Sequence, residues 1–390
     1  MTASDPLKIL YGYISYRSPY EDCERLTAAY LRRLCQAGFD VKGFCLTLNP
    51  PGPRLHWPEL DARWRRGDRE LMTMYEQLVK KLEGRNVFVN GSGINLHPEF
   101  VRQLPVFRVF QCCDDPESSD NLSRPVAHAY DLCVVNNIAE VETYRRWGVK
   151  RAHWIPLGFR ADMADPALTY DQIISGDRDV DVMMIADRLS PWRAKRMDVL
   201  HAAFPNAHFY GQGWPCGYLD RADEIRLMGR SKIGPNVHNS TGPINLRTFY
   251  LPANGVMQIC DNKRNLGAIY ELNRQVVGFD TIEECVELCR YYLAHDAERR
   301  QIAAEGWKHA VTEYNEIAIF KKISDVVVTY RGENEPTKFS CDPVVLNLIE
   351  WGHNTRFRRW VYNAVAPVRW LCGILCRLGR GVWSRILAGG

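Results

Sequence analysis

The residues with the most informative chemistry lie in one segment, Ser231 to Asp261, with the sequence SKIGPNVHNSTGPINLRTFYLPANGVMQICD. Its apolar run at 233–237 predicts a short strand, and the turn formers that follow predict a loop. Apolar residues at three- and four-residue spacing predict a helix over 245–251. Asn-Gly ends that helix before a second buried strand at 256–260.

This order of strand, loop, helix and strand favours an anion site at the start of the helix. A helix that begins just after the carboxyl end of a strand directs free N–H groups and its positive dipole end into the crevice above the sheet. Asn245, Arg247 and Thr248 could bring further donors to a phosphate. The alternative is that Arg247 is a solvated helix charge. The flanking strand ends add three candidates, Asn236, His238 and Asp261.

The loop after the apolar run 182–186 holds Arg188 and Arg193, which are candidates for phosphate contacts. Surface charge is the alternative for Arg193. Asp179 and Asp181 precede the same run and have the D-x-D spacing of some divalent-metal sites. They are predicted to lie at the amino end of a strand, away from the crevice, so no metal site is predicted there.

A tight turn, Gly211-Gln212-Gly213-Trp214-Pro215, follows another short strand at 208–210. Gly211 and Gly213 would let the backbone approach a flat ligand, and Trp214 offers a stacking face. The turn would then hold a planar base. The alternative is a structural turn capped by a packed tryptophan.

In the first half of the chain, polar residues follow the carboxyl ends of three predicted strands. Such ends line the crevice of a parallel sheet, so these residues are candidates for binding a second substrate or for acting as a general base. The alternatives are a loop histidine beside a proline and an Asx-type turn at Asp-Asp-Pro. The binding candidates are Tyr16 and Arg17, and the candidate bases are His97, Asp114 and Asp115.

Strand and helix patterns alternate along two successive stretches, which implies parallel sheets and an α/β fold with two Rossmann-like domains. No G-x-G-x-x-G follows the first strand, which weakens a dinucleotide-cofactor interpretation. We place the first domain at 1–158, the second at 159–330, and a crossover segment with the tail at 331–390. Strands of the first domain are predicted at 8–13, 41–46, 86–90, 108–112, 132–136 and 153–156.

The C-terminal tail differs from the rest in composition. Seven arginines follow Glu350, the single acid from that position onward, whereas the 390-residue chain has a net charge of only +4. The basic charge therefore belongs to the tail and predicts no nucleic-acid partner. Arginines beside an apolar stripe at helical spacing favour a basic amphipathic helix on an anionic membrane surface. The alternative is a terminal helix pair packed on the protein. The membrane candidates are Trp360, Arg369, Trp370, Arg377 and Trp383.

The segment NLRTFYLPANGVMQICD resembles the Arg-Thr-Phe-Glu signature of the CgeB-like glycosyltransferases, named after a spore maturation protein, among the group 1 transferases of the GT-B fold. The resemblance continues in order through CCDDPESSD, YDLCVVNN, YRRWGVKRAHWIPLGF, VDVMMIADRLSPWRAKR and FYGQGWP, and downstream through VVGFDTIEECVELCRYYLAHDAERRQIAAEGWKHAVTEY. It implies two Rossmann-like domains that face each other across a cleft. One position departs from the signature: Tyr250 stands where the family usually carries a Glu that faces the donor's ribose or sugar.

The resemblance implies a glycosyltransferase that works without a metal or cofactor and moves a sugar from a nucleotide-diphosphate donor to a hydroxyl. The second domain would hold the donor, and the first a glycan or glycolipid acceptor. Asn245, Arg247 and Thr248 would neutralise the departing diphosphate. The tail suggests a lipid-linked or cell-envelope glycan as acceptor. The alternatives are a catalytically silent sugar-nucleotide-binding scaffold, which Tyr250 favours, and a sugar-nucleotide epimerase.

The cysteine content and the lack of a signal-peptide pattern predict a location. Thirteen cysteines without zinc-site spacing are typical of a reducing cytosol. No apolar run has the length of a membrane span. We therefore expect a bacterial cytoplasmic protein held peripherally on the cytoplasmic face of the inner membrane.

Overall fold

The computed structural model describes residues 6–16, 22–50, 52, 54–91, 95–214, 216–239 and 245–333, with the backbone alone at 187, 188, 192, 212 and 333. Within these ranges no helix is long and apolar enough to cross a bilayer. Several sequence candidates lie outside the described residues or side chains: Arg17, the side chain of Arg188, and the tail residues Trp360, Arg369, Trp370, Arg377 and Trp383.

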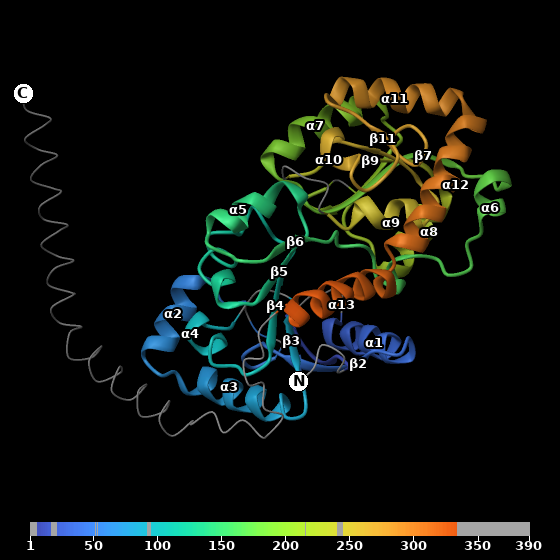
Figure 1. Ribbon diagram of the computed structural model, residues 1–390. Coiled ribbons are helices and arrows are strands. Elements are labelled where there is room, and N and C mark those ends of the chain that lie inside the picture. Colours follow the sequence, from blue (N-terminus) through green and yellow to red (C-terminus); the bar gives the residue numbers. More distant parts are fainter. Residues whose placement is uncertain are drawn as a thin grey trace, which may run out of the picture.

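Two parallel sheets form the molecule, one in each half of the chain (Figure 1). The first has the order β2-β1-β3-β4-β5-β6. All residues of β3 and β5 are buried, as expected for the apolar runs of a parallel sheet covered on both faces. The observed bounds lie within two residues of the predicted ranges. The strands are β1 (Lys8–Tyr13), β2 (Asp40–Cys45), β3 (Val87–Asn90), β4 (Phe107–Cys112), β5 (Leu132–Val135) and β6 (Ala152–Trp154).

The helices of the first half connect these strands. The carboxylates of Asp22 and Asp68 cap α1 and α3 by accepting first-turn N–H groups. Gly38 stops α1 with φ of +93°. The helices are α1 (Cys23–Gln36), α2 (Trp57–Arg65), α3 (Arg69–Lys81), α4 (Pro98–Val101), η1 (Ala127–Ala129), η2 (Ile138–Glu140) and α5 (Val141–Arg146).

The second sheet has the order β11-β10-β9-β7-β8 and is also parallel throughout. At the amino end of β7, Asp179 pairs with Arg230 (2.5 Å) and Asp181 with Lys232 (2.6 Å). The prediction that this D-x-D lies away from the crevice is thus confirmed. The strands are β7 (Val180–Arg188), β8 (His208–Gln212), β9 (Ser231–Asn236), β10 (Met257–Cys260) and β11 (Val277–Gly278).

The helices around the second sheet are η3 (Ala161–Met163), α6 (Tyr170–Ser175), α7 (Pro191–Ala203), α8 (Arg221–Arg230), α9 (Arg247–Ala253), α10 (Lys263–Leu266), α11 (Ile282–Ala294), α12 (Asp296–Glu313) and α13 (Glu316–Glu333). The last of these, α13, returns to the first domain and packs against α1 and β5 (Figure 1). The crossover therefore begins before residue 331, within the range that the sequence analysis gave to the second domain.

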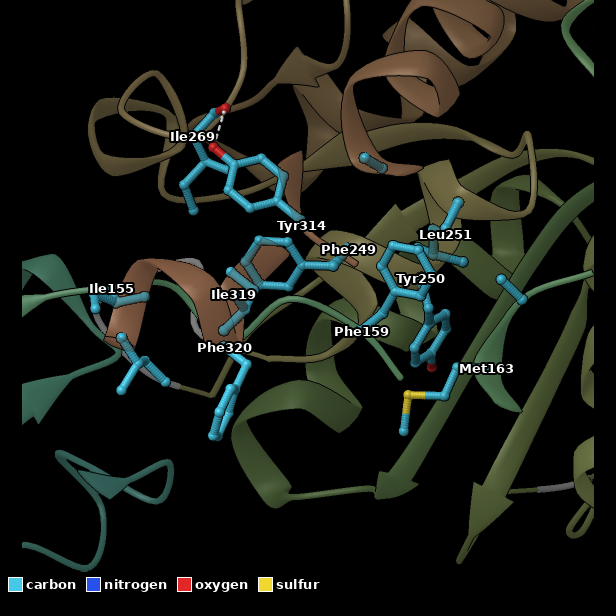
Figure 2. Close-up of a cluster of buried hydrophobic side chains, with 14 of the residues drawn as sticks. Ile155, Phe159, Met163, Phe249, Tyr250, Leu251, Ile269, Tyr314, Ile319 and Phe320 are labelled. Carbon is cyan, nitrogen blue, oxygen red and sulfur yellow. Dashed lines mark hydrogen bonds between the residues drawn. The ribbon is translucent and has the colours of Figure 1, made fainter. Parts of the chain in front are cut away.

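One apolar cluster continues through the junction of the two domains. It joins Phe249 and Tyr250 of α9 to Tyr314, and then to Ile319 and Phe320 of α13 (Figure 2). The same cluster includes the buried residues on one face of the first sheet. The two domains thus share a core.

Both sheets share one topology, which locates their crevices. The first strand of each half, β1 or β7, lies between the second strand and the third. Strand order therefore reverses between β1 and β3 and between β7 and β9. In such sheets ligands bind outside the carboxyl ends of the strands at this reversal.

Candidate functional site

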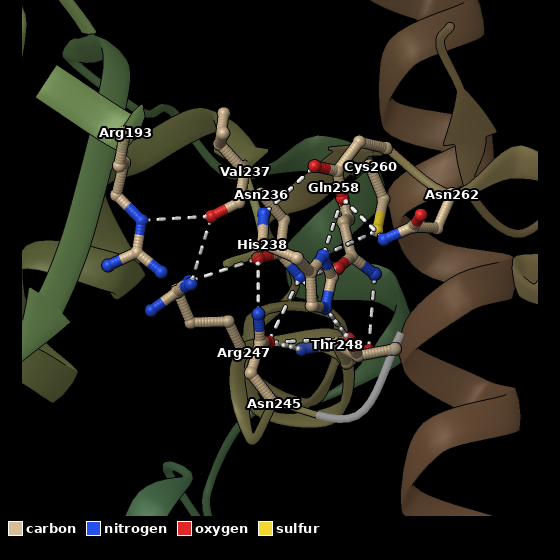
Figure 3. Close-up of polar contacts among 11 residues, drawn as sticks. Arg193, Asn236, Val237, His238, Asn245, Arg247, Thr248, Gln258, Cys260 and Asn262 are labelled. Carbon is tan, nitrogen blue, oxygen red and sulfur yellow. Dashed lines mark hydrogen bonds and ion pairs between the residues drawn. The ribbon is translucent and has the colours of Figure 1, made fainter. Parts of the chain in front are cut away.

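A fully buried side chain at the carboxyl end of β9, Asn236, organises the polar network of Figure 3. Its Oδ1 accepts hydrogen bonds from Nε of Arg247 and from Nδ2 of Asn245, both at 3.0 Å. Its Nδ2 donates to Oε1 of Gln258 on β10 at 2.8 Å. A buried amide requires partners at both ends, so this network fixes the direction of Arg247.

The guanidinium of Arg247 lies across the reversal point of the second sheet. Its Nη1 donates to the carbonyl of Ile185 on β7, and its Nη2 to the carbonyl of Val237 just after β9, each at 3.3 Å. The residue is only 7% exposed. The alternative of a solvated helix charge is therefore wrong, and Arg247 is a buried cation at the predicted crevice.

A second buried cation, Arg193, meets Arg247 at the same carbonyl. Arg193 lies in the first turn of α7, which Ser190 caps, and is 4% exposed. Its Nε donates to the carbonyl oxygen of Val237 at 3.1 Å. Figure 3 shows the two guanidinium groups side by side at one edge of the network. The surface-charge alternative for Arg193 is wrong as well.

Electrostatics at this pair favour an added anion. Burial and then the charge of Arg247 lower the pKa of Arg193 to about 9, against the opposing effects of Asp261, Tyr250 and Glu117. Among the described residues no carboxylate lies within ion-pair distance of Arg247. Two buried guanidinium groups with this excess of positive charge suit a diphosphate, which accepts forked hydrogen bonds.

The start of α9 differs from the expected free N–H groups. The N–H of Thr248 donates to Oδ1 of Asn245 at 3.1 Å, and those of Phe249 and Tyr250 donate to the carbonyl of Leu246. The side chain of Thr248 is fully buried. Because these donors are occupied and α9 has seven residues, the arginine side chains rather than the helix end supply the anion site. The prediction that Thr248 contacts the phosphate directly is therefore wrong.

His238 and Asp261 form a buried pair beneath the site. Nδ1 of His238 lies 2.5 Å from one carboxylate oxygen of Asp261, and the His238 backbone N–H donates to the other at 2.9 Å. Burial lowers the pKa of His238, although Asp261 acts in the opposite direction. The pair holds the loop after β9 in place. Because the ring of His238 is buried, it is not available to contact a sugar-nucleotide donor.

Cys260 completes a group with His238 and Asp261 whose possible ligand atoms all lie within 4.8 Å of one another. Both ring nitrogens of His238 have neighbours, Asp261 on Nδ1 and the Thr248 hydroxyl on Nε2 at 3.3 Å. Burial raises the pKa of the Cys260 thiol well above its usual range. A protonated thiol and an occupied imidazole fit a metal ion poorly.

The tryptophan of the turn after β8 packs into the interior of the protein. A Cβ on Gly211, whose φ is +144°, would lie 1.6 Å from the carbonyl oxygen of Ala186, and Gly213 has φ of +84°. Gly211 is thus required by its close packing against β7, and Gly213 by its positive φ. Trp214 is buried with its ring centroid 6.0 Å from that of Phe209. Stacking of a base on Trp214 is therefore wrong, and the packed-turn alternative holds.

Tyr250 lies in the apolar cluster rather than in the polar network. Figure 2 shows its ring near Phe159 and Met163 of the connection between the domains. Its hydroxyl is nevertheless close enough to raise the pKa of Arg193. Tyr250 is thus a buried residue of the apolar cluster whose charge state is coupled to that of Arg193.

In the first domain, Asp115 is fixed by its neighbours. Its carboxylate accepts hydrogen bonds from the hydroxyls of Ser119 (3.0 Å), Ser123 (2.7 Å) and Tyr144 (2.5 Å). Burial raises its pKa, and these hydrogen bonds oppose the rise. A buried carboxylate with three hydroxyl donors is a structural anchor, so its assignment as a base is wrong.

The other candidate bases are also committed elsewhere. Asp114 forms an ion pair with Arg54. His97 is buried between the rings of Trp57 and Trp64, and its Nδ1 accepts the N–H of Glu99 at the start of α4. Burial lowers its pKa to about 4. The loop-histidine alternative is therefore correct for His97.

Two exposed side chains of the first domain remain near strand ends. Tyr16, after β1, is 46% exposed and remains a candidate for acceptor binding. Glu117, after β4, is exposed and acts electrostatically on Arg193 of the second domain. The sequence analysis quoted the segment that contains Glu117 but selected its neighbours, because spacing alone cannot show which carboxylate turns outward.

Comparisons with known proteins agree with this architecture. A protein family described as glycosyl transferase-like matches residues 189–325, a little over a third of the chain and the part that contains both arginines. No curated protein matches the chain by sequence. The chain thus carries a glycosyltransferase family domain.

Several solved structures share the fold. HepE from Anabaena in complex with UDP and glucose is 14% identical, with a TM-score of 0.55, and the match covers 83% of this chain and 100% of that one. Sucrose-phosphate synthase from Thermosynechococcus elongatus is 14% identical over 84% of this chain and 100% of its own, with a TM-score of 0.56. A glycosyltransferase from Rickettsia africae is 12% identical over 85% and 100%, with a TM-score of 0.58. The likeness shows the two-domain fold of GT-B glycosyltransferases.

Proposed function

We propose that the protein transfers a sugar from a nucleotide-diphosphate donor to an acceptor hydroxyl. The carrying observation is the pair of buried guanidinium groups at the reversal point of the second sheet, Arg193 and Arg247, which share the carbonyl of Val237. Cleavage of the donor leaves negative charge on the diphosphate. Fixed cations in a poorly solvated site stabilise that charge without reorganising.

The donor belongs to the second domain and the acceptor to the first in this proposal. The fold is shared with proteins whose structures hold UDP or UDP-glucose, which makes UDP-glucose the first donor to test. The CgeB-like signature around Arg247 supports the same assignment. In this proposal the two arginines supply the positive charge that a metal ion would otherwise bring.

Isothermal titration of the protein with UDP, UDP-glucose and uridine tests this proposal. We expect UDP and UDP-glucose to bind and uridine, which lacks phosphates, to bind far more weakly. Slow release of UDP from UDP-glucose in the absence of an acceptor is expected as transfer to water. Failure of UDP, ADP and GDP alike to bind to folded protein would contradict the proposal.

The same samples separate the alternatives. A silent scaffold binds the nucleotide sugar but releases no nucleoside diphosphate, with water or with envelope glycans as acceptor. An epimerase converts UDP-glucose into a second UDP-sugar, which proton NMR detects without any acceptor.

We further propose that the acceptor is a lipid-linked or cell-envelope glycan and that the tail binds the cytoplasmic face of the membrane. The support is the arginine-rich amphipathic sequence after residue 350. The full-length protein should co-sediment with vesicles containing anionic phosphatidylglycerol and not with neutral phosphatidylcholine vesicles. Replacing Arg369 and Arg377 by Glu should release it. Equal binding of both vesicle types would contradict a charge-directed anchor.

A further inference from the structure

A tyrosine of β1, Tyr11, places its hydroxyl at the strand reversal of the first sheet. Its backbone lies opposite Val89 of β3. A Cβ on Gly91, two residues further along, would lie 2.3 Å from the Tyr11 hydroxyl oxygen, so the phenol end rests against this glycine. Two residues of a strand span roughly 6–7 Å. The side chain therefore leans across β3 toward the carboxyl edge of the sheet, where the crevice lies.

Neighbouring groups hold this phenol in place. The ring of Tyr30 on α1 meets it edge-on, with 5.9 Å between the ring centroids and an angle of 69° between the planes. The N–H of Gly91 donates to the carbonyl of Gly12 at 3.0 Å, which keeps the ends of β1 and β3 together. A side chain at position 91 would occupy the place of the phenol. Gly91 thus leaves the room that the Tyr11 hydroxyl fills.

The direction of this side chain differs from that of Tyr13, which is two residues along β1 and on the same face. The Tyr13 ring lies against Gly43 of β2, where a Cβ would be 3.1 Å from its Cε1. Gly43 is the strand partner of Tyr11 and not of Tyr13, so the Tyr13 ring leans backward and away from β3. Of these two tyrosines, only Tyr11 reaches the reversal point between β1 and β3.

The Tyr11 hydroxyl has no partner within the protein. No described residue forms a hydrogen bond with it, and the side chain is partly exposed. Desolvation and then the charge of Cys113 raise the pKa of Tyr11 to about 12, whereas Arg160 acts in the opposite direction. The hydroxyl is therefore protonated near neutral pH. It can donate one hydrogen bond and accept others.

We propose that the Tyr11 hydroxyl binds a sugar hydroxyl of the acceptor, an inference that rests on the proposed function above. The first domain holds the acceptor in that function, and a ligand of its sheet would lie at the reversal point that Tyr11 reaches. A sugar hydroxyl both donates and accepts hydrogen bonds, and a protonated phenol matches it in both directions. Tyr11 thus contributes to acceptor specificity and takes no part in proton transfer.

Tyr11→Phe removes the hydroxyl and keeps the ring that packs on Gly91 and Tyr30. With UDP-glucose as donor and methyl glucoside, methyl galactoside and methyl mannoside as acceptor probes, we expect KM for the glycoside to rise roughly three- to tenfold, the effect of one lost neutral hydrogen bond. UDP affinity, measured by calorimetric titration, should be retained. The melting temperature should not fall, because the hydroxyl has no partner within the protein. Tyr13→Phe, the same change on the neighbouring ring, should keep the KM of the wild type.

The outcomes distinguish this inference from the proposed function. Lack of UDP binding by the folded wild type would overturn both. UDP binding without transfer to any of the three glycosides would overturn a sugar unit as the ligand and leave donor binding intact. An unchanged KM in Tyr11→Phe, an equal rise in Tyr13→Phe, or a loss of UDP affinity in place of the KM change would overturn the role of Tyr11. A lower melting temperature of Tyr11→Phe would do the same, since it would reveal a structural hydrogen bond.

Discussion

At the residue scale, the molecule places two like charges together where neither is solvated. Arg193 and Arg247 share one carbonyl acceptor, and burial with their mutual repulsion weakens the hold of Arg193 on its proton. Such an arrangement lowers stability and is kept where function requires it. The sequence predicted both arginines as phosphate contacts because they follow strand ends. It could not show that they converge, since they are 54 positions apart.

Residue-scale prediction was weaker for the carboxylates. Asp114 and Asp115 follow a strand just as Arg193 does, but Asp115 turns inward to Tyr144, which is 29 positions away in sequence. Nothing in the spacing reveals that partner. The structure thus contradicts Asp115 as a base, and the catalytic role of its segment stays a prediction.

His97 provides a pH test of its structural role. Its pKa is lowered to about 4, first by burial, whereas an unfolded chain binds this proton near pH 6.5. Between those values the unfolded state takes up a proton that the folded state does not. The free energy of unfolding should therefore fall as the pH drops from 6.5 to 4, by up to about 3 kcal/mol from this residue.

His97→Asn removes that titration while keeping a side chain that can cap α4. Urea unfolding at pH 7 and pH 4.5 should show a smaller difference for the variant than for the wild type. Identical pH dependence in the two proteins would show that His97 is not the titrating group.

At the element scale, the strands were predictable and some helices were not. Parallel strands buried on both faces are continuous apolar runs, and β1, β3 and β5 were found from them. In contrast, α2 begins at Trp57, directly after a proline-rich stretch that by itself favours a loop. Proline at the second position of α2 starts the helix rather than breaking it.

One buried arginine joins the ends of two helices in the second domain. Nη1 of Arg178 donates to the carbonyls of Met228 (2.8 Å) and Ser231 (2.7 Å), and its Nη2 to that of Asn254 (3.0 Å). Met228 and Ser231 lie at the end of α8, and Asn254 caps α9. This side chain thus donates to buried carbonyls at the ends of both helices.

Arg178→Met should lower the free energy of unfolding by roughly 2–4 kcal/mol, because three buried hydrogen bonds of its guanidinium are lost. Chemical denaturation measures this change. The matched control is Arg230→Gln, which breaks an exposed ion pair with Asp179 and should change the free energy of unfolding far less. Similar losses in the two variants would contradict a special role for Arg178.

At the scale of the whole molecule, the two domains are joined by two neighbouring connections. The N–H of Phe159 donates to the carbonyl of Tyr314 at 2.9 Å. The buried carboxylate of Glu316 accepts from Arg33 of the first domain and from the N–H of Ala161 at 3.2 Å. Two domains follow from the alternating sequence pattern. The contacts of Glu316, called the latch below, do not follow from that pattern, since Glu316 and Arg33 are 283 positions apart.

Glu316→Gln should loosen this latch, because the charge that holds Arg33 is lost. Hydrogen–deuterium exchange should become faster at the amides of 159–163, while the central strands keep their protection. Glu313→Gln, which alters an exposed pair with Lys322, is the control and should leave these amides unchanged. Unaltered exchange in the Glu316 variant would show that the latch contributes little.

The central claim is that buried cations of the second domain bind the donor diphosphate, and calorimetric titration with UDP of the wild type, Arg193→Met and Lys195→Met tests it most directly. Lys195 is an exposed charge on the same helix. We expect Arg193→Met to lose about tenfold or more in affinity, the contribution of a charge-assisted hydrogen bond, and Lys195→Met to bind as the wild type does. The melting temperature of ligand-free Arg193→Met should not fall, since a buried unfavourable charge is removed. Unchanged UDP affinity in Arg193→Met would contradict the account.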